Sequence, residues 1–133
     1  MSHRLSFVNP SEMGPPAAAY SHVVEAVGGR TLYLSGQVAL DERGELVGPG
    51  DLRAQTEQVM KNIQAGLRAL GGEMRHVFKR TLYLTDIARL PEARAGAAGY
   101  FDEAHPPAST AVEVRRLFRD EFLIEVEVIA VVP

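Results

Sequence analysis

The side chains best suited to chemistry in this sequence are three glutamates that alternate with apolar residues: Glu113, Glu125 and Glu127. In an extended strand, Glu125 and Glu127 share one face, because successive side chains point to opposite sides. A carboxylate in a partly dehydrated cleft can orient a water molecule or accept its proton. The same glutamates could instead form a solvated strand face or salt bridges between subunits, and the residue pattern leaves both interpretations open.

Motifs for other common chemistries are missing. The sequence contains none of the patterns GxGxxG, GxxxxGK[ST], HExxH or GxSxG. The four histidines have no metal-ligand spacing, and the absence of cysteine excludes disulfides and thiolate metal sites. Ser35-Gly36-Gln37 interrupts an apolar strand pattern, and a glycine inside a strand often marks a bulge or a close backbone approach.

Two segments have the spacing of amphipathic helices. Apolar residues recur every three or four positions from about Asp51 to Leu70 and from about Leu90 to Ala104. Asp51 is a suitable N-cap for the first helix, and Gly71-Gly72 supplies its stop. Pro91 suits the first turn of the second helix, where its missing N–H matters least.

The remaining apolar segments alternate with a period of two and predict six strands. These strands lie near Leu5–Val8, His22–Val27, Thr31–Leu40, His76–Leu84, Thr110–Val114 and Leu123–Val132. Gly28-Gly29 predicts a tight hairpin between the second and third strands. The order of elements predicts a single α+β domain over residues 1–133, with a mixed sheet and both helices on one face.

The last strand predicts that the sheet has a second, uncovered face. One side of this strand is a purely apolar row that two helices can cover: Ile124, Val126, Val128, Ala130 and Val132. The other side mixes the two glutamates with large apolar residues that no helix remains to bury: Leu123, Ile129 and Val131. Such a face is rarely exposed on a monomer, so we expect self-association, with a closed symmetric ring as one solution.

Composition and charge exclude several classes of protein. The 133 residues are 46% hydrophobic and 23% charged, which is ordinary globular usage rather than that of a disordered or fibrous chain. The net charge is -3 and the arginines are scattered, so we do not expect nucleic-acid binding. No apolar run approaches the roughly 18 residues of a membrane span, and no secretory signal is visible, so we expect a cytoplasmic protein without a membrane partner.

Five segments of the chain together resemble the reactive intermediate deaminase family (RidA/YjgF), whose members are often labelled endoribonuclease L-PSP or translation initiation inhibitor. They are Ala19-Tyr20-Ser21-His22, Leu32 to Gln37, Ala54-Gln55-Thr56, Lys79 to Asp86 and Ile124 to Glu127. The resemblance runs from about Tyr20 to Val132. It implies a chorismate-mutase-like fold in a homotrimer, with sheets lining a central barrel, helices outside and three clefts between subunits. Active members hydrolyse enamines and imines, such as 2-aminoacrylate, to keto acids and ammonia without a cofactor.

The resemblance also assigns roles to individual residues. Tyr20 matches the site tyrosine of the family, although Ala19 replaces the usual proline. Ser35, followed by Gly36, matches the serine that helps hold the ligand. Glu125 matches the glutamate that orients the attacking water, and no metal site is implied.

One family residue is replaced in this chain. The family pattern P-A-R-[ST]-x-V-x-V carries a catalytic arginine, and the matching segment, Pro107 to Val114, has Ser109 at that position. A guanidinium clamps a substrate carboxylate with two charge-assisted hydrogen bonds, whereas a serine offers one neutral hydroxyl. Losing such a contact costs about 2–5 kcal/mol, which is about 30-fold to several thousandfold in rate or affinity. We offer the hypothesis that Arg94, where family members commonly have asparagine, supplies a relocated cation; the alternative is a solvent-facing helix arginine.

Three functions therefore compete. The first is a trimeric protein that binds an imine, enamine or keto acid in its clefts without the standard deaminase step, as Ser109 suggests. The second is an active enamine or imine hydrolase with an altered substrate, as the retained Tyr20, Ser35 and Glu125 suggest. The third is the ribonuclease or translation-inhibitor role of the older labels, which the acidic pI of about 5.8 and the scattered arginines disfavour.

Overall fold

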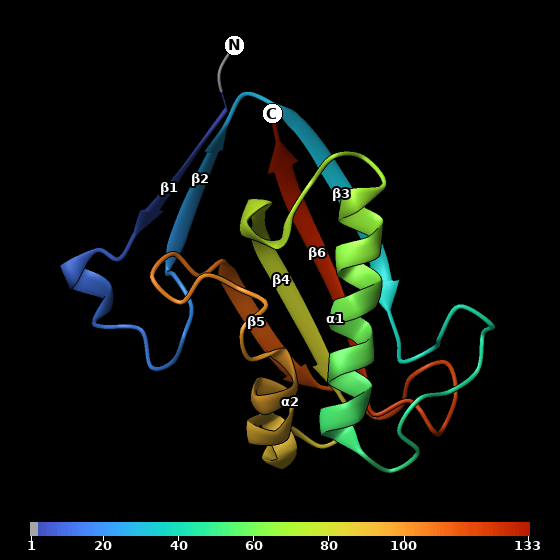
Figure 1. Ribbon diagram of the computed structural model, residues 1–133. Coiled ribbons are helices and arrows are strands. Elements are labelled where there is room, and N and C mark those ends of the chain that lie inside the picture. Colours follow the sequence, from blue (N-terminus) through green and yellow to red (C-terminus); the bar gives the residue numbers. More distant parts are fainter. Residues whose placement is uncertain (1–2) are drawn as a thin grey trace.

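The predicted mixed sheet forms, and two helices pack against one of its faces (Figure 1). The computed structural model describes residues 3–133. The order of the four-stranded sheet is β3-β6-β4-β5, and its strands are β3 (Arg30–Gln37), β6 (Ile124–Val132), β4 (Val77–Leu84) and β5 (Ala108–Glu113). β6 runs antiparallel to both of its neighbours, whereas β4 and β5 are parallel. This architecture confirms the α+β prediction.

The first predicted helix is α1 (Leu52–Arg68). The side chain of Asp51 accepts a hydrogen bond from the Ala54 backbone N–H at 3.0 Å, so it is the N-cap. Beyond the helix, the Gly72 N–H donates to the Leu67 carbonyl at 2.8 Å and the chain turns back. The apolar stripe of α1 is buried against the sheet and includes Leu52, Val59, Met60, Ile63 and Leu67. Each such side chain contributes roughly 1.5–3 kcal/mol when it leaves water.

The second helix, α2 (Leu90–Ala97), is shorter than the predicted segment to Ala104. A short 3-10 turn over Ile87–Arg89 precedes it. The helix ends because Ala98 adopts an extended ψ of 133° and Gly99 follows with φ of +83°. Tyr100 and Phe101 lie in the loop that follows but still pack against the core, so the apolar spacing continues where the helix does not.

The hairpin predicted at Gly28-Gly29 is wrong. β2 (Val23–Val27) pairs with β1 (Arg4–Val8) in a separate two-stranded sheet, while β3 pairs with β6. Both glycines have positive φ, near 70°, and the chain turns there from one sheet into the other (Figure 1). A short 3-10 turn, Ser11–Met13, lies between β1 and β2. A further 3-10 turn, Met74–His76, leads into β4.

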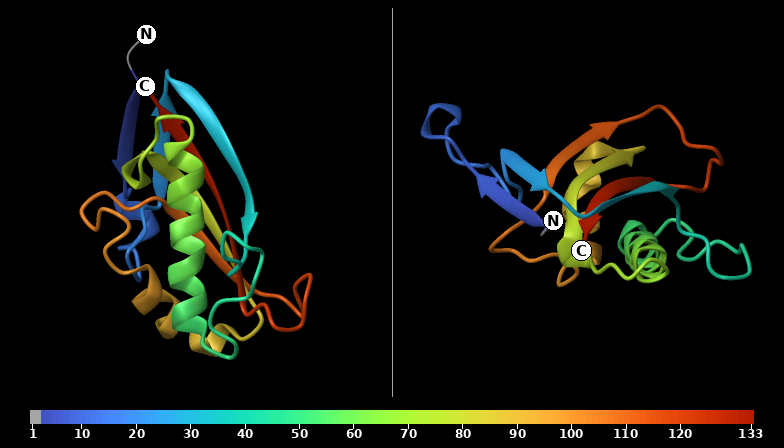
Figure 2. Two further views of the ribbon diagram at one scale, coloured as in Figure 1. Left: turned by 45° about the vertical axis from the view of Figure 1, so that its right-hand side comes forward. Right: turned by 90° about the horizontal axis from the view of Figure 1, so that it is seen from above.

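The two faces of the sheet differ as predicted, with one correction. The apolar row of β6 is fully buried beneath the helices, which lie on the same side of the curved sheet in both views of Figure 2. On the opposite face, hereafter the open face, Leu123 and Ile129 are half-buried. Val131, predicted to be uncovered, is buried because the turn at Gly29 lies over it; a Cβ added to Gly29 would be 3.1 Å from Val131 Cγ2. No helix among residues 3–133 is long and apolar enough to cross a membrane.

Candidate functional site

The predicted site residues fall into two groups on opposite faces of the sheet. Tyr20, Arg94 and Ser109 line one pocket on the helix side. Ser35, Gly36 and Glu125 do not line that pocket. The strand register explains the division. Ser109 on β5 and Val128 on β6 both pair with Arg80 on β4, and all three face the helices. Glu125 is separated from Val128 by an odd number of positions along β6, so it faces the other way.

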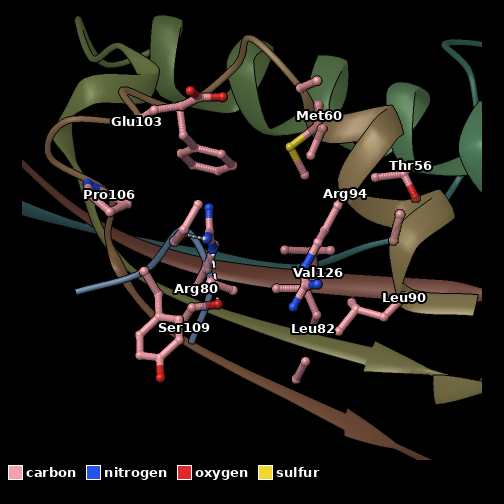
Figure 3. A pocket seen from close by; sticks show the side chains of 18 of the residues that line it. Thr56, Met60, Arg80, Leu82, Leu90, Arg94, Glu103, Pro106, Ser109 and Val126 are labelled. Atoms are coloured by element: carbon pink, nitrogen blue, oxygen red, sulfur yellow. Dashed lines mark hydrogen bonds between the residues drawn. The ribbon is translucent and has the colours of Figure 1, made fainter. Parts of the chain in front are cut away.

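The helix-side pocket is a cavity of about 230 Å³ between α2 and the strands (Figure 3). Its walls are mostly apolar and include Met60, Leu82, Leu90, Ala93, Phe101 and Val126. A cavity of this volume has room for several water molecules, which suits a small metabolite.

The three predicted residues enter this pocket in different ways. Arg94 is exposed, but it extends from α2 toward the strands and lines the cavity (Figure 3). Ser109 lies half-buried on β5. The ring of Tyr20 packs edge-on against His22, and its hydroxyl accepts a hydrogen bond from the Ala17 N–H at 3.2 Å.

Arg80 is a pocket residue that the sequence pattern alone did not identify. It is directly opposite Ser109 in the register of β4 and β5, and its Nε donates a hydrogen bond to Ser109 Oγ at 3.0 Å (Figure 3). Its Nη2 donates to the Ala19 carbonyl at 2.7 Å, and its guanidinium lies 4.7 Å from the centre of the Phe101 ring. Strand alternation is the sequence signal that could have identified Arg80, because it places Arg80 on the same face of β4 as Leu82 and the buried Leu84.

The surroundings of Arg80 disfavour its charge. Burial, followed by the positive charge of Arg94, lowers the pKa of Arg80 to about 10. The group remains protonated at neutral pH because this value is still well above 7. The helix-side pocket therefore carries the positive charges of Arg80 and Arg94, and its lining also includes two carboxylates, Asp102 and Glu103.

The second group is the open-face cluster, which consists of Ser35, Gly36 and Glu125. The pairing of β3 with β6 shifts register between Leu34 and Gln37, so Ser35 and Gly36 form the bulge expected from the sequence. A Cβ at Gly36 would collide with the Glu125 carboxylate. The absence of a side chain at Gly36 thus leaves the space that the Glu125 carboxylate occupies against the bulge.

Two further residues of the open face, Tyr83 and Glu127, form a pair that the sequence pattern did not predict. The Tyr83 hydroxyl donates a 2.6 Å hydrogen bond to Glu127 Oε1, and Tyr83 is the cross-strand partner of Glu125. The hydrogen bond to Glu127 is the main reason that the pKa of Tyr83 lies above its ordinary value. Glu127 is therefore occupied by Tyr83, whereas no protein donor within residues 3–133 forms a hydrogen bond to Glu125 side-chain oxygens. Both oxygens of the half-buried Glu125 carboxylate thus remain free of protein donors, whereas one oxygen of the exposed Glu127 accepts from Tyr83.

Comparisons with known proteins agree with this fold. The family model of Endoribonuclease L-PSP matches residues 11–132. A RutC family protein of Pyrococcus horikoshii is 42% identical over 122 residues, covering 91% of this chain and 90% of the relative. The 3-aminoacrylate deaminase RutC of Acinetobacter baylyi is 34% identical over 121 residues, covering 91% and 93%. The crystal structure of YyfB from Yersinia pestis, a Rid family protein of unknown function, matches with a TM-score of 0.84 and 37% identity over 99% of this chain and 100% of that one.

These matches define the class of protein as one with the fold of the Rid proteins, in which two helices cover one face of a mixed sheet. The chain belongs to the Rid (RidA/YjgF) family, which includes the proteins labelled endoribonuclease L-PSP. The resemblance seen in the sequence segments is thereby confirmed.

Proposed function

We propose that the protein is a homotrimer that binds a small imine, enamine or keto acid in clefts between its subunits and hydrolyses the imine with water oriented by Glu125. The observation that carries this proposal is the division of the expected site residues between the helix-side pocket and the open-face cluster. In one chain the two groups lie on opposite faces of the sheet. A neighbouring subunit that sets its open face against the pocket supplies the missing group.

The apolar character of the open face supports self-association. Tyr33 is 78% exposed and Val112 is 38% exposed, and both pair with open-face residues, Ile129 and Tyr83. Exposed apolar residues on one face favour contact with another protein surface. A closed ring covers this face in every subunit, and three sheets arranged in this way line a central barrel. Sedimentation equilibrium tests the assembly, with a mass three times the 14.5 kDa of the chain as the expected result.

The chemistry follows from the residues that the cleft brings together. The Glu125 carboxylate accepts a proton from a bound water, and the water oxygen attacks the carbon of the C=N bond. Glu125 returns this proton to the nitrogen, which gives a carbinolamine. The carbinolamine hydroxyl proton then passes to the nitrogen, and ammonia leaves as the C–N bond breaks and the C=O bond forms, which gives a keto product. Tyr20 and Ser35 hold the substrate in the orientation that this attack requires. The reaction consumes one water and needs no electron acceptor, because the C=N bond is already activated for attack.

A relative named 3-aminoacrylate deaminase supports hydrolysis of a C=N or enamine bond as the reaction type. The replacement of the family arginine by Ser109 favours a second candidate, a protein that binds keto acids without turnover. The two candidates are distinguished by measuring the release of ammonia and keto acid from freshly generated imines, together with calorimetric binding of 2-oxobutanoate. Turnover above a buffer blank supports the hydrolase. Binding without turnover supports the second candidate.

A further inference from the structure

One arginine lies directly beside Ser109, the position at which the family pattern carries its arginine. Arg80 reaches Ser109 from the adjacent strand, and three contacts hold its guanidinium: Ser109 Oγ, the Ala19 carbonyl and the Phe101 ring. The planar group is therefore fixed in place before any ligand arrives. A fixed guanidinium loses little conformational freedom when it binds an anion, which favours affinity.

Arg80 retains hydrogen-bond donors for a ligand. A guanidinium carries five N–H groups, and the two hydrogen bonds to the protein use one on Nε and one on Nη2. The remaining N–H groups, one on Nη2 and two on Nη1, suffice for a two-point contact with a carboxylate. Ser109 consumes the Nε donor, so it orients Arg80 rather than replacing it as a ligand.

Arg80 and Arg94 form no ion pair in the part of the chain that the structure describes, although Asp102 and Glu103 also line the helix-side pocket. The ion pairs between side chains of residues 3–133 involve other arginines or, for Asp102, His105. Neither Arg80 nor Arg94 has a carboxylate oxygen within 4.0 Å. Arg80 is half-buried, whereas Arg94 is exposed. A half-buried charge without a counter-charge at close range is costly, and an anion bound to Arg80 relieves this cost. The lowered pKa of Arg80 is consistent with such an environment, because its causes are burial and the charge of Arg94.

We propose that Arg80 binds the substrate carboxylate in this protein, with Ser109 as its positioning residue and Arg94 as a second cation at the same cavity. This inference rests on the proposed function, since it names the group that recognises the substrate of that site. The substrate class is an imine or keto acid with a carboxylate next to the reacting carbon and an aliphatic side chain. The carboxylate binds Arg80, and the side chain lies against the apolar wall that includes Met60, Leu82 and Leu90.

The experiment compares a charged ligand with its neutral isostere. Calorimetry with 2-oxobutanoate and with 2-oxobutanamide is carried out on the wild type, R80Q and R80K. We expect R80Q to weaken 2-oxobutanoate binding by about 30-fold or more, while binding of the amide changes by less than about threefold. R80K retains the charge but not the two-point geometry, so an intermediate loss is expected.

Two further variants test the geometry. S109A removes the acceptor that orients Arg80, so it should weaken the binding of 2-oxobutanoate several-fold and leave the binding of 2-oxobutanamide unchanged. R80S/S109R moves the arginine one strand across, to the family position, and should recover much of the affinity lost in R80Q. The matched control is R53Q, because Arg53 is exposed on α1, forms only a surface ion pair with Glu57 at 3.8 Å and does not line the pocket. R53Q should bind both ligands as the wild type does.

The outcomes separate this inference from the proposed function. If the wild type binds 2-oxobutanoate and R80Q binds it equally well, the role of Arg80 is refuted and the proposed function stands. If R80Q loses both ligands equally while keeping its helical spectrum and its assembly mass, Arg80 acts only by holding the pocket together, and the inference is again refuted. If the wild type binds neither ligand and hydrolyses no imine, the proposed function fails and the inference fails with it.

Discussion

A site shared between subunits predicts that two inactive variants restore activity when they are mixed. S109W fills the helix-side pocket with an indole, and E125Q removes the carboxylate of the open-face cluster. Each variant alone should have activity near background, because every site in its trimer lacks one half. In mixed trimers, a pocket from an E125Q chain meets an open face from an S109W chain, and that site is intact.

The expected recovery of activity follows from the fraction of sites that contain both an intact pocket and an intact open face. With equal amounts and random exchange, half of the pockets and half of the open faces are intact, so about a quarter of the sites have both. Imine hydrolysis of the mixture should therefore recover to about 25% of the wild-type rate. The assay is ammonia and keto acid release after co-refolding the two variants, with differently tagged chains to verify that mixed trimers form.

The matched control is a mixture of E125Q with the double variant S109W/E125Q, in which no chain supplies an intact open face. This mixture should remain at background. If S109W and E125Q co-purify in mixed assemblies but show no recovered activity, the site is built within one chain, and the two opposite faces do not combine across subunits.

Three smaller perturbations test individual contacts. G36A should lower kcat by at least about tenfold in steady-state assays, because the new Cβ must displace the Glu125 carboxylate from the bulge; an unchanged kcat would show that this position is unimportant. In an ultraviolet titration, Tyr83 should deprotonate at a higher pH than free tyrosine, since a hydrogen bond to Glu127 raises its pKa, and E127Q should move its titration back toward lower pH. L67A should lower the free energy of unfolding by about 2–5 kcal/mol in chemical denaturation, because Leu67 lies on the fully buried side of α1, and a loss below about 1 kcal/mol would contradict this packing.

Periodicity predicted those parts of the fold that depend on local burial. The buried stripe of α1 and the apolar row of β6 follow directly from spacings of 3.6 and 2 residues. The bulge at Ser35-Gly36 was also accessible, because a glycine within an apolar strand weakens the regular ladder and favours an irregularity there. In each case the signal lies within one segment of the chain.

Features that depend on pairing between distant segments were not predictable in this way. Gly28-Gly29 has the composition of a hairpin turn, but β2 pairs with β1 and β3 pairs with β6, a choice that local sequence does not encode. The contact of Arg80 with Ser109 joins strands 29 residues apart in the chain, and only the register of the sheet reveals it. The end of α2 at Ala97 was missed because Tyr100 and Phe101 continue the apolar spacing after the helix has stopped.

The central claim is that this chain hydrolyses imines with water held by Glu125, although Ser109 stands at the family arginine position. The most direct test generates imines from 2-aminobutyrate with an amino acid oxidase and measures ammonia and 2-oxobutanoate release by wild type and E125Q. We expect release by the wild type well above a buffer-and-protein blank, and a loss of at least about a hundredfold in E125Q while 2-oxobutanoate still binds. Equal rates in wild type and E125Q, or no release by either, would contradict the claim.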